Sequence, residues 1–87
     1  MAPTREEVLE RIRSHLSEEL GIDESKIREE SSFKDDLEAD SLDLVQLVVE
    51  LEDQYGIRIT EEQAEKIRTV GQAVDFVFAE TPAGRAG

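Results

Sequence analysis

One segment restricts the fold of this chain more than any other. The residues from Ser41 to Tyr55 contain neither glycine nor proline. Asp40 stands directly before the segment, Asp43 comes three positions later, and Gly56 follows its end. Aspartate accepts hydrogen bonds from the amides of a first helical turn and complements the helix dipole, whereas glycine often ends a helix. The pattern therefore predicts a helix that begins at Ser41 and ends before Gly56.

This predicted helix carries two apolar stripes, although a helix at the surface of a small protein needs only one. The first stripe, with spacings of one, three and four residues, suits burial and comprises Leu44, Leu47, Val48, Leu51 and Tyr55. The second begins beside Ser41 and comprises Leu42, Val45 and Val49. Two interpretations stay open: the second stripe packs beneath a loop, or it is a docking strip rimmed by carboxylates.

Three further helices are expected. Thr4 and Glu7 form a capping-box pattern at the start of the first helix, and Gly21 provides its end. A third helix of about two turns follows Thr60, and a fourth lies between Thr69 and Thr81-Pro82. The apolar stripe of the first helix comprises Val8, Leu9, Ile12, Leu16 and Leu20.

Residues 22–39 show no sustained period and predict a long ordered loop. Its hydrophobic anchors are Ile22, Ile27, Phe33 and Leu37. Loops of this length are uncommon in compact domains and usually have a function. The chain of 87 residues has room for one domain. We expect residues 1–81 to form it and residues 82–87 to be a disordered tail. The predicted fold is all-α, a small four-helix bundle with a long first loop and a short third helix.

The charge of the chain restricts its partners. The formal net charge is −12 at pH 7, and residues 29–53 alone carry ten carboxylates and one lysine. Such a charge repels nucleic acid and anionic lipid and favours basic protein surfaces. No stretch approaches the roughly 20 apolar residues of a membrane span. We therefore expect a cytoplasmic monomer that neither binds nucleic acid nor inserts into membranes.

Few residues are available for catalysis or metal binding. The chain has no cysteine, and His15 is its single histidine. Asp36, Glu38 and Asp40 alternate as in a calcium-binding loop, but Ser41 replaces the required glycine and a leucine replaces the closing glutamate. A serine nucleophile needs an activating base, and none is apparent near Ser41. The sequence therefore predicts neither a catalytic residue nor a metal site.

Ser41 is better placed as an acceptor of a phosphate ester than as a nucleophile. An ester on its hydroxyl would lie near the free amides and the positive end of the predicted helix. The alternative is a serine that serves only in helix capping.

The residues around Ser41 resemble a known family. Leu37-Glu38-Ala39-Asp40-Ser41-Leu42-Asp43, with Ala64-Glu65-Lys66-Ile67 and Thr69-Val70 further on, closely resembles the acyl carrier proteins of type II fatty acid synthesis. The likeness runs from about Thr4 to Val77. It implies that Ser41 carries 4′-phosphopantetheine, added from coenzyme A by a phosphopantetheinyl transferase, and that the terminal thiol holds acyl chains as thioesters. A chain without cysteine needs such a source of sulfur.

The resemblance also implies two surfaces. An acyl pocket between the second and third helices would be lined by Phe33, Leu51, Ile59, Ala64 and Ile67, whose alternative role is core packing. Fatty acid synthesis enzymes with basic docking surfaces would recognise Asp40, Leu42, Asp43, Val45, Val49, Glu52 and Asp53. The protein would then be a non-catalytic carrier.

Four residues depart from the pattern of the family. Many relatives have glycine in place of Glu38, smaller or polar residues in place of Leu44, an acid in place of Gln46 and an apolar residue in place of Lys34. These departures bear on acyl length and partner choice, so a carrier for a polyketide or another specialised acyl pathway stays open. A different class of function, an acidic adaptor that docks basic proteins without a prosthetic group, is a more remote alternative, as is a hydrolase that uses Ser41.

Overall fold

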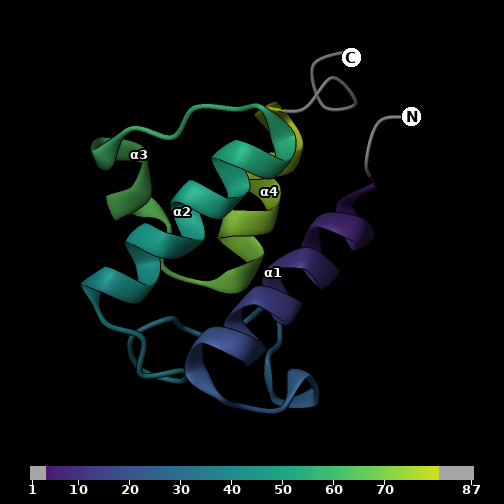
Figure 1. Ribbon diagram of the computed structural model, residues 1–87, viewed down its shortest axis with the longest axis vertical. Coiled ribbons are helices and arrows are strands. Elements are labelled where there is room, and N and C mark those ends of the chain that lie inside the picture. Colours follow the sequence, from purple (N-terminus) through teal and green to yellow (C-terminus); the bar gives the residue numbers. More distant parts are fainter. Residues whose placement is uncertain (1–3, 81–87) are drawn as a thin grey trace.

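The computed structural model describes residues 4–80, which form four α-helices (Figure 1). They are α1 (Arg5–Leu20), α2 (Ser41–Tyr55), α3 (Glu61–Lys66) and α4 (Val70–Glu80). One turn of 3-10 helix, η1 (Glu24–Lys26), interrupts the long loop. Over residues 4–80 no strand forms beyond an isolated bridge between Ser32 and Thr69. The predicted all-α fold is confirmed, and the expected tail at 82–87 lies outside the described residues.

The helix ends follow the signals in the sequence. The Glu7 amide donates to Thr4 Oγ1 over 3.1 Å, which caps α1. Gly21 and Gly56 end α1 and α2 with φ angles of 68° and 62°, a left-handed conformation that glycine adopts without a steric penalty.

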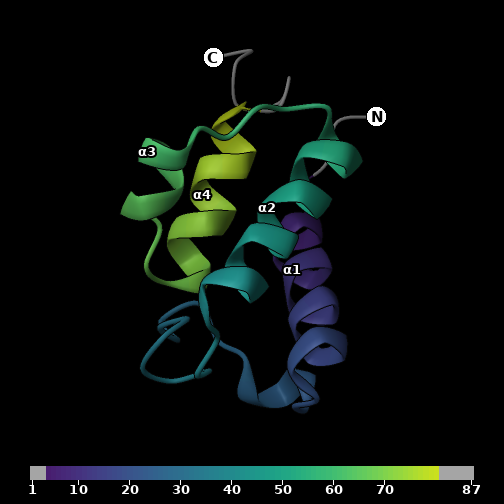
Figure 2. The same ribbon diagram turned by 60° about the vertical axis from the view of Figure 1, so that its left-hand side comes forward.

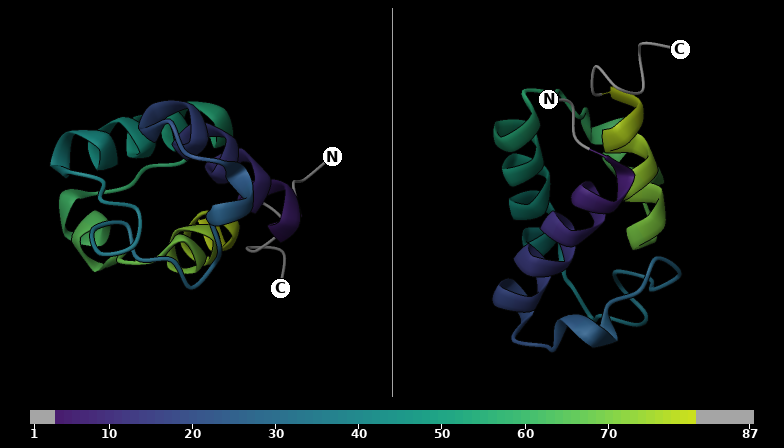
Figure 3. Two further views of the ribbon diagram at one scale, coloured as in Figure 1. Left: turned by 90° about the horizontal axis from the view of Figure 1, so that it is seen from below. Right: turned by 90° about the vertical axis from the view of Figure 1, so that its right-hand side faces the viewer.

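The core is built by three of the four helices, the long loop and Ile59 of the connector between α2 and α3. Helix α1 packs most extensively on α4 and also contacts α2 (Figure 2). Helix α3 lies on the side of the bundle away from α1 (Figure 3) and contributes no buried residue. The fully buried large side chains are Val8, Ile12, Leu16, Ile27, Phe33, Leu51, Val70, Val74 and Val77. The bundle therefore has a well-packed body and one short helix at its side.

Backbone hydrogen bonds attach the long loop to the segment before α4. The amide of Phe33 donates to the carbonyl of Arg68 over 3.0 Å, and the amide of Val70 donates to the carbonyl of Ser31 over 3.0 Å. A third bond of 2.7 Å joins the Gly71 amide to the Glu29 carbonyl, and a Cβ at position 71 would lie only 3.0 Å from that oxygen.

Three of the four predicted loop anchors are buried: Ile27, Phe33 and Leu37. Ile22 is only partly buried. Ala39 and Ser31 are also buried, which the sequence pattern did not indicate. Ser31 is polar, and its Oγ accepts a hydrogen bond from the Arg28 amide, which makes the burial of this hydroxyl tolerable.

Glu38 adopts a left-handed backbone conformation with φ of 54°, alone among the non-glycine residues that the structure describes. It separates the buried residues Leu37 and Ala39, just before α2 begins. This conformation brings the side chain of any residue except glycine close to its own backbone. Glycine, which has no Cβ, would adopt this conformation without that close approach.

We predict that Glu38→Gly stabilises the fold by roughly 0.5–1 kcal/mol, because glycine relieves the left-handed strain but loses more entropy on folding. Urea denaturation measures the change. Glu38→Ala is the matched control, since it removes the charge and keeps the strain. Equal stabilisation in both variants would assign the effect to charge and contradict this account.

A surface ion-pair network joins three parts of the chain at the start of α1. The Arg5 guanidinium contacts Glu29 Oε1 in the loop through Nη2 and donates from Nε to Asp75 Oδ1 in α4 over 2.7 Å. The hydrogen bond from Arg5 holds the pKa of Glu29 below its ordinary value of 4.5. Because the folded state lowers this pKa, the stabilisation is present above pH 4.5 and is lost as the pH falls through the folded value.

Arg5→Gln is expected to lower the melting temperature at pH 7 and to have less effect at a pH well below 4.5, where Glu29 is protonated in both proteins. Arg28→Gln changes the charge equally but affects only a solvent-exposed contact with Glu30 of 4.0 Å, so it serves as the control. Melting curves over this pH range provide the test. A loss in Arg5→Gln that is independent of pH would contradict the proposed linkage.

Candidate functional site

Ser41 opens α2 with its side chain exposed to solvent. The residues beside it fix the helix start through a reciprocal capping box. The Asp43 amide donates to Asp40 Oδ1 over 3.0 Å, and the Asp40 amide donates to Asp43 Oδ2 over 3.2 Å. Asp40 and Asp43, two of the four carboxylates expected in partner recognition, are thus each engaged in capping through one oxygen.

Ser41 itself takes no part in the capping box. Within residues 4–80, the Ser41 hydroxyl and the amides of Ser41 and Leu42 have no hydrogen-bond partner in the protein. The site therefore presents an outward hydroxyl together with two free amides at the positive end of a helix, an arrangement that suits an anionic ester.

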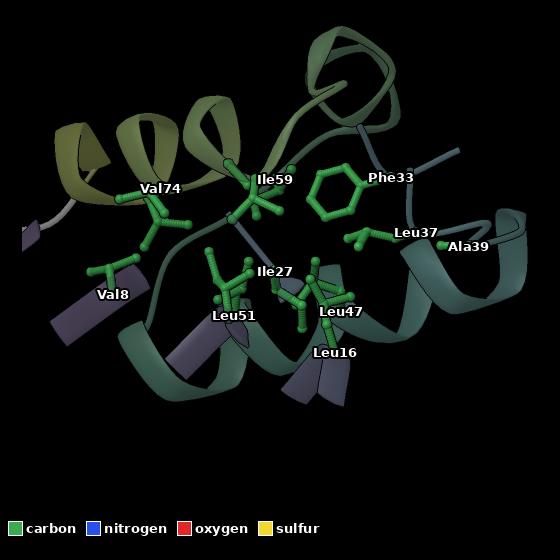
Figure 4. Packing of buried hydrophobic residues seen from close by; sticks show 14 residues of the cluster. Val8, Leu16, Ile27, Phe33, Leu37, Ala39, Leu47, Leu51, Ile59 and Val74 are labelled. Carbon is green, nitrogen blue, oxygen red and sulfur yellow. The ribbon is translucent and has the colours of Figure 1, made fainter. Parts of the chain in front are cut away.

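Ser41 also lines a cavity of about 840 Å³ between α2 and α3. All five residues expected in the pocket line this cavity: Phe33, Leu51, Ile59, Ala64 and Ile67. Figure 4 shows Phe33 and Ile59 facing Leu47 and Leu51 of α2 across the core. The first three expected residues belong to the buried core, so core packing and cavity lining coincide there.

The cavity has further walls that the sequence interpretation did not assign to it. Leu44 and Val48 line it, although both were assigned to the stripe that packs against the other helices. Counting in helical steps from Ser41 would have indicated them, because positions three and seven residues later share its face. Lys34 and Arg68 line the cavity as well.

The second stripe of α2 is exposed, with 63% of Leu42, 56% of Val45 and 49% of Val49 accessible to solvent. The interpretation in which this stripe packs beneath the loop is therefore wrong. Val45 and Val49 also line the cavity, so the exposed strip and the cavity adjoin.

The two acids near the end of the strip differ in their surroundings. Asp53 is exposed, whereas Glu52 is partly buried and its Oε2 accepts a hydrogen bond of 2.8 Å from the Ile59 amide. No pattern in the sequence indicated this bond, because it spans the turn at Gly56 and depends on the path of the connector.

His15 lies on α1 with a side chain that is 19% exposed, and its Nε2 lies 4.0 Å from Glu19 Oε2. It does not line the cavity that Ser41 borders. Within residues 4–80, no group of three or more potential ligands is arranged to hold a metal ion, and no helix is long and apolar enough to span a membrane.

Comparison with known proteins identifies the family. The family model described as the phosphopantetheine attachment site matches residues 10–77, which include Ser41 and all five expected pocket residues. The chain is also 55% identical, over 73 residues, to an acyl carrier protein from Rubrobacter xylanophilus, covering 84% of this chain and 90% of the relative. The chain belongs to the acyl carrier protein family.

Two solved acyl carrier protein structures have the same fold. The one from Enterococcus faecalis superposes with a TM-score of 0.79 at 42% identity, covering 91% of this chain and all of the other. The one from Thermotoga maritima gives 0.75 at 34% identity, covering 87% and 88% of the two chains. The four-helix bundle expected from the resemblance is therefore confirmed.

Membership of this family makes the chain an acyl carrier whose covalent cofactor is 4′-phosphopantetheine. The residues present fit that group, because an exposed hydroxyl borders an aliphatic cavity. The alternative of an adaptor without a prosthetic group is thereby overturned.

Proposed function

We propose that Ser41 is the attachment residue and that the chain is a non-catalytic carrier of acyl intermediates in type II fatty acid synthesis. The observation that carries this proposal is the position of one exposed hydroxyl, which both heads α2 and borders the cavity. In this proposal residues 1–81 act as one carrier domain, and the protein works as a cytoplasmic monomer.

The cofactor and the protein have different roles, which follow from the amino-acid composition of the chain. The bound group supplies a terminal thiol, which the chain lacks because it has no cysteine. Ser41 Oγ holds the phosphate, and the free amides of Ser41 and Leu42 with the helix dipole favour its charge. Asp40 and Asp43 oppose that charge, but both lie in a solvated, screened region.

The cavity residues would shield an alkyl chain from water. Each buried methylene contributes about 0.8 kcal/mol, so burial of several offsets the displacement of a lightly packed wall. Ala64 and Ile67 are partly buried and belong to the α3 side, whereas Phe33, Leu51 and Ile59 belong to the core. The α3 side of the cavity is therefore the wall that moves when an alkyl chain enters.

The exposed strip supports the docking of basic enzymes. The strip residues Leu42, Val45 and Val49 supply apolar contact. Negative charge comes from the carboxylates around it, which are Asp40, Asp43, Glu52 and Asp53. A phosphopantetheinyl transferase and fatty acid synthesis enzymes with basic docking surfaces fit this pattern.

Incubation with coenzyme A, Mg²⁺ and a broad phosphopantetheinyl transferase is expected to add the mass of one phosphopantetheine group to the wild-type protein and none to Ser41→Ala. The variant removes the only hydroxyl at the head of α2. Intact-protein mass spectrometry measures the adduct.

Ser14→Ala is the matched control, because Ser14 is an exposed serine on α1, and it should accept the group as the wild type does. An adduct of equal yield on Ser41→Ala, or none on the wild type, would refute the assignment of Ser41.

Replacement of both Val45 and Val49 by serine is expected to raise the KM of the transferase for this protein by about tenfold, because the apolar centre of the docking strip is lost. Both side chains are about half exposed, so the folded bundle should persist. Initial-rate kinetics and a melting curve give the two readouts. An unchanged KM in a folded variant would show that docking uses another surface.

A carrier for a specialised acyl pathway is the second candidate. Leu44 and Lys34, two of the departures from the family pattern, both line the cavity and so alter its shape and charge. The acyl species on protein purified from its host separates the two pathways.

A further inference from the structure

The side chain of Glu52 links two functional surfaces of α2, the cavity and the exposed strip, which adjoin at Val45 and Val49. Its Oε2 accepts the Ile59 amide over 2.8 Å. Ile59 is 7% exposed and forms part of the cavity wall, directly before Thr60, the N-cap of α3. Glu52 therefore holds the chain at the point where the wall and α3 begin.

This connector is held by one hydrogen bond to α2 and by the packing of Ile57 and Ile59 against the core. In the part of the chain that the structure describes, no other hydrogen bond joins residues 57–59 to α2. Helix α3 has no buried residue, and its own capping box, Thr60 with Gln63, is internal to it. Loss of the Glu52 bond would leave apolar packing as the attachment of the connector, and would consequently loosen Ile59 and the adjoining start of α3.

The same carboxylate borders the exposed strip. Glu52 lies three residues after Val49 on α2, and Asp53 lies four residues after it, so both flank the last apolar residue of the strip. Glu52 is only partly buried and is thus accessible to a group that docks there. An arginine that pairs with both carboxylate oxygens would compete with the Ile59 amide for Oε2.

We propose that Glu52 is a positioning residue that latches the cavity wall through Ile59, and that a cationic side chain docked beside Val49 releases this latch. Docking of a basic partner on the exposed strip of α2 then loosens the adjoining cavity. The use of this coupling in acyl delivery rests on the proposed carrier function, but the latch itself is a property of the chain without its prosthetic group.

The first test measures amide hydrogen exchange at Ile59 by ¹⁵N NMR on the apo-protein. Glu52→Ala should exchange about tenfold faster than the wild type, because the amide loses its acceptor. Glu52→Gln should stay close to the wild type, since its side-chain carbonyl can still accept the bond. Asp53→Ala is the matched control for loss of a neighbouring charge, and it should leave the rate unchanged.

The second test adds a hexa-arginine peptide at low ionic strength. Exchange at Ile59 should accelerate in the wild type and in Asp53→Ala. It should not change in Glu52→Gln, which keeps the hydrogen bond but lacks the charge that draws the arginine.

Equal exchange at Ile59 in the wild type and Glu52→Ala would overturn the latch. An Ile59 rate that stays constant in the wild type at saturating peptide would overturn its release. Both results are independent of Ser41, so failure of the latch and failure of the carrier assignment are distinguishable.

Discussion

The structure depends on the attachment of the long loop to the segment that enters α4. Three backbone hydrogen bonds between residues 29–33 and 68–71 hold Phe33 in the core. From that point the chain turns through Glu38 and delivers Asp40 and Ser41 to the start of α2. The Ser41 hydroxyl is thus positioned by a loop that is itself part of the core, so its location relative to the cavity is fixed.

Because of this arrangement, α3 is not needed to build the core. Helices α1, α2 and α4, the long loop and Ile59 of the α2–α3 connector supply the buried residues, while α3 supplies none. A protein of this size has little apolar surface to spare, and a guest alkyl chain must be accommodated without loss of the fold. Because α3 itself carries none of the core, it can move at small cost. The Glu52 bond to Ile59 gives this side of the cavity a defined closed position.

The sequence predicted what depends on local signals and on apolar periodicity. Asp40, Gly21 and Gly56 set helix ends through their own backbone preferences, and the stripes of α1 and α2 separated buried from exposed faces. The resemblance to acyl carrier proteins supplied the five pocket residues, all of which line the cavity. Whether the second stripe of α2 was covered could not be predicted, because that depended on the path of the loop.

The features that escaped prediction are those made by contacts distant in sequence. The burial of Ser31 follows from its hydrogen bonds to Arg28 and Val70, and the role of Glu52 follows from the course of the connector. The left-handed backbone at Glu38 also escaped prediction. The sequence showed that a glutamate occupies this position, but it did not show that the backbone adopts a conformation that favours glycine. Neither charge nor periodicity encodes such contacts.

The central claim is that a chain carried at Ser41 enters the space between α2 and α3. The most direct measurement is nuclear Overhauser contact between the alkyl protons of an octanoyl-loaded protein and its side chains. The account predicts contacts to Leu51 and Ile59 in the cavity. Contacts confined to Leu42, which lies on the exposed strip outside the cavity lining, with none to Leu51 or Ile59, would contradict it.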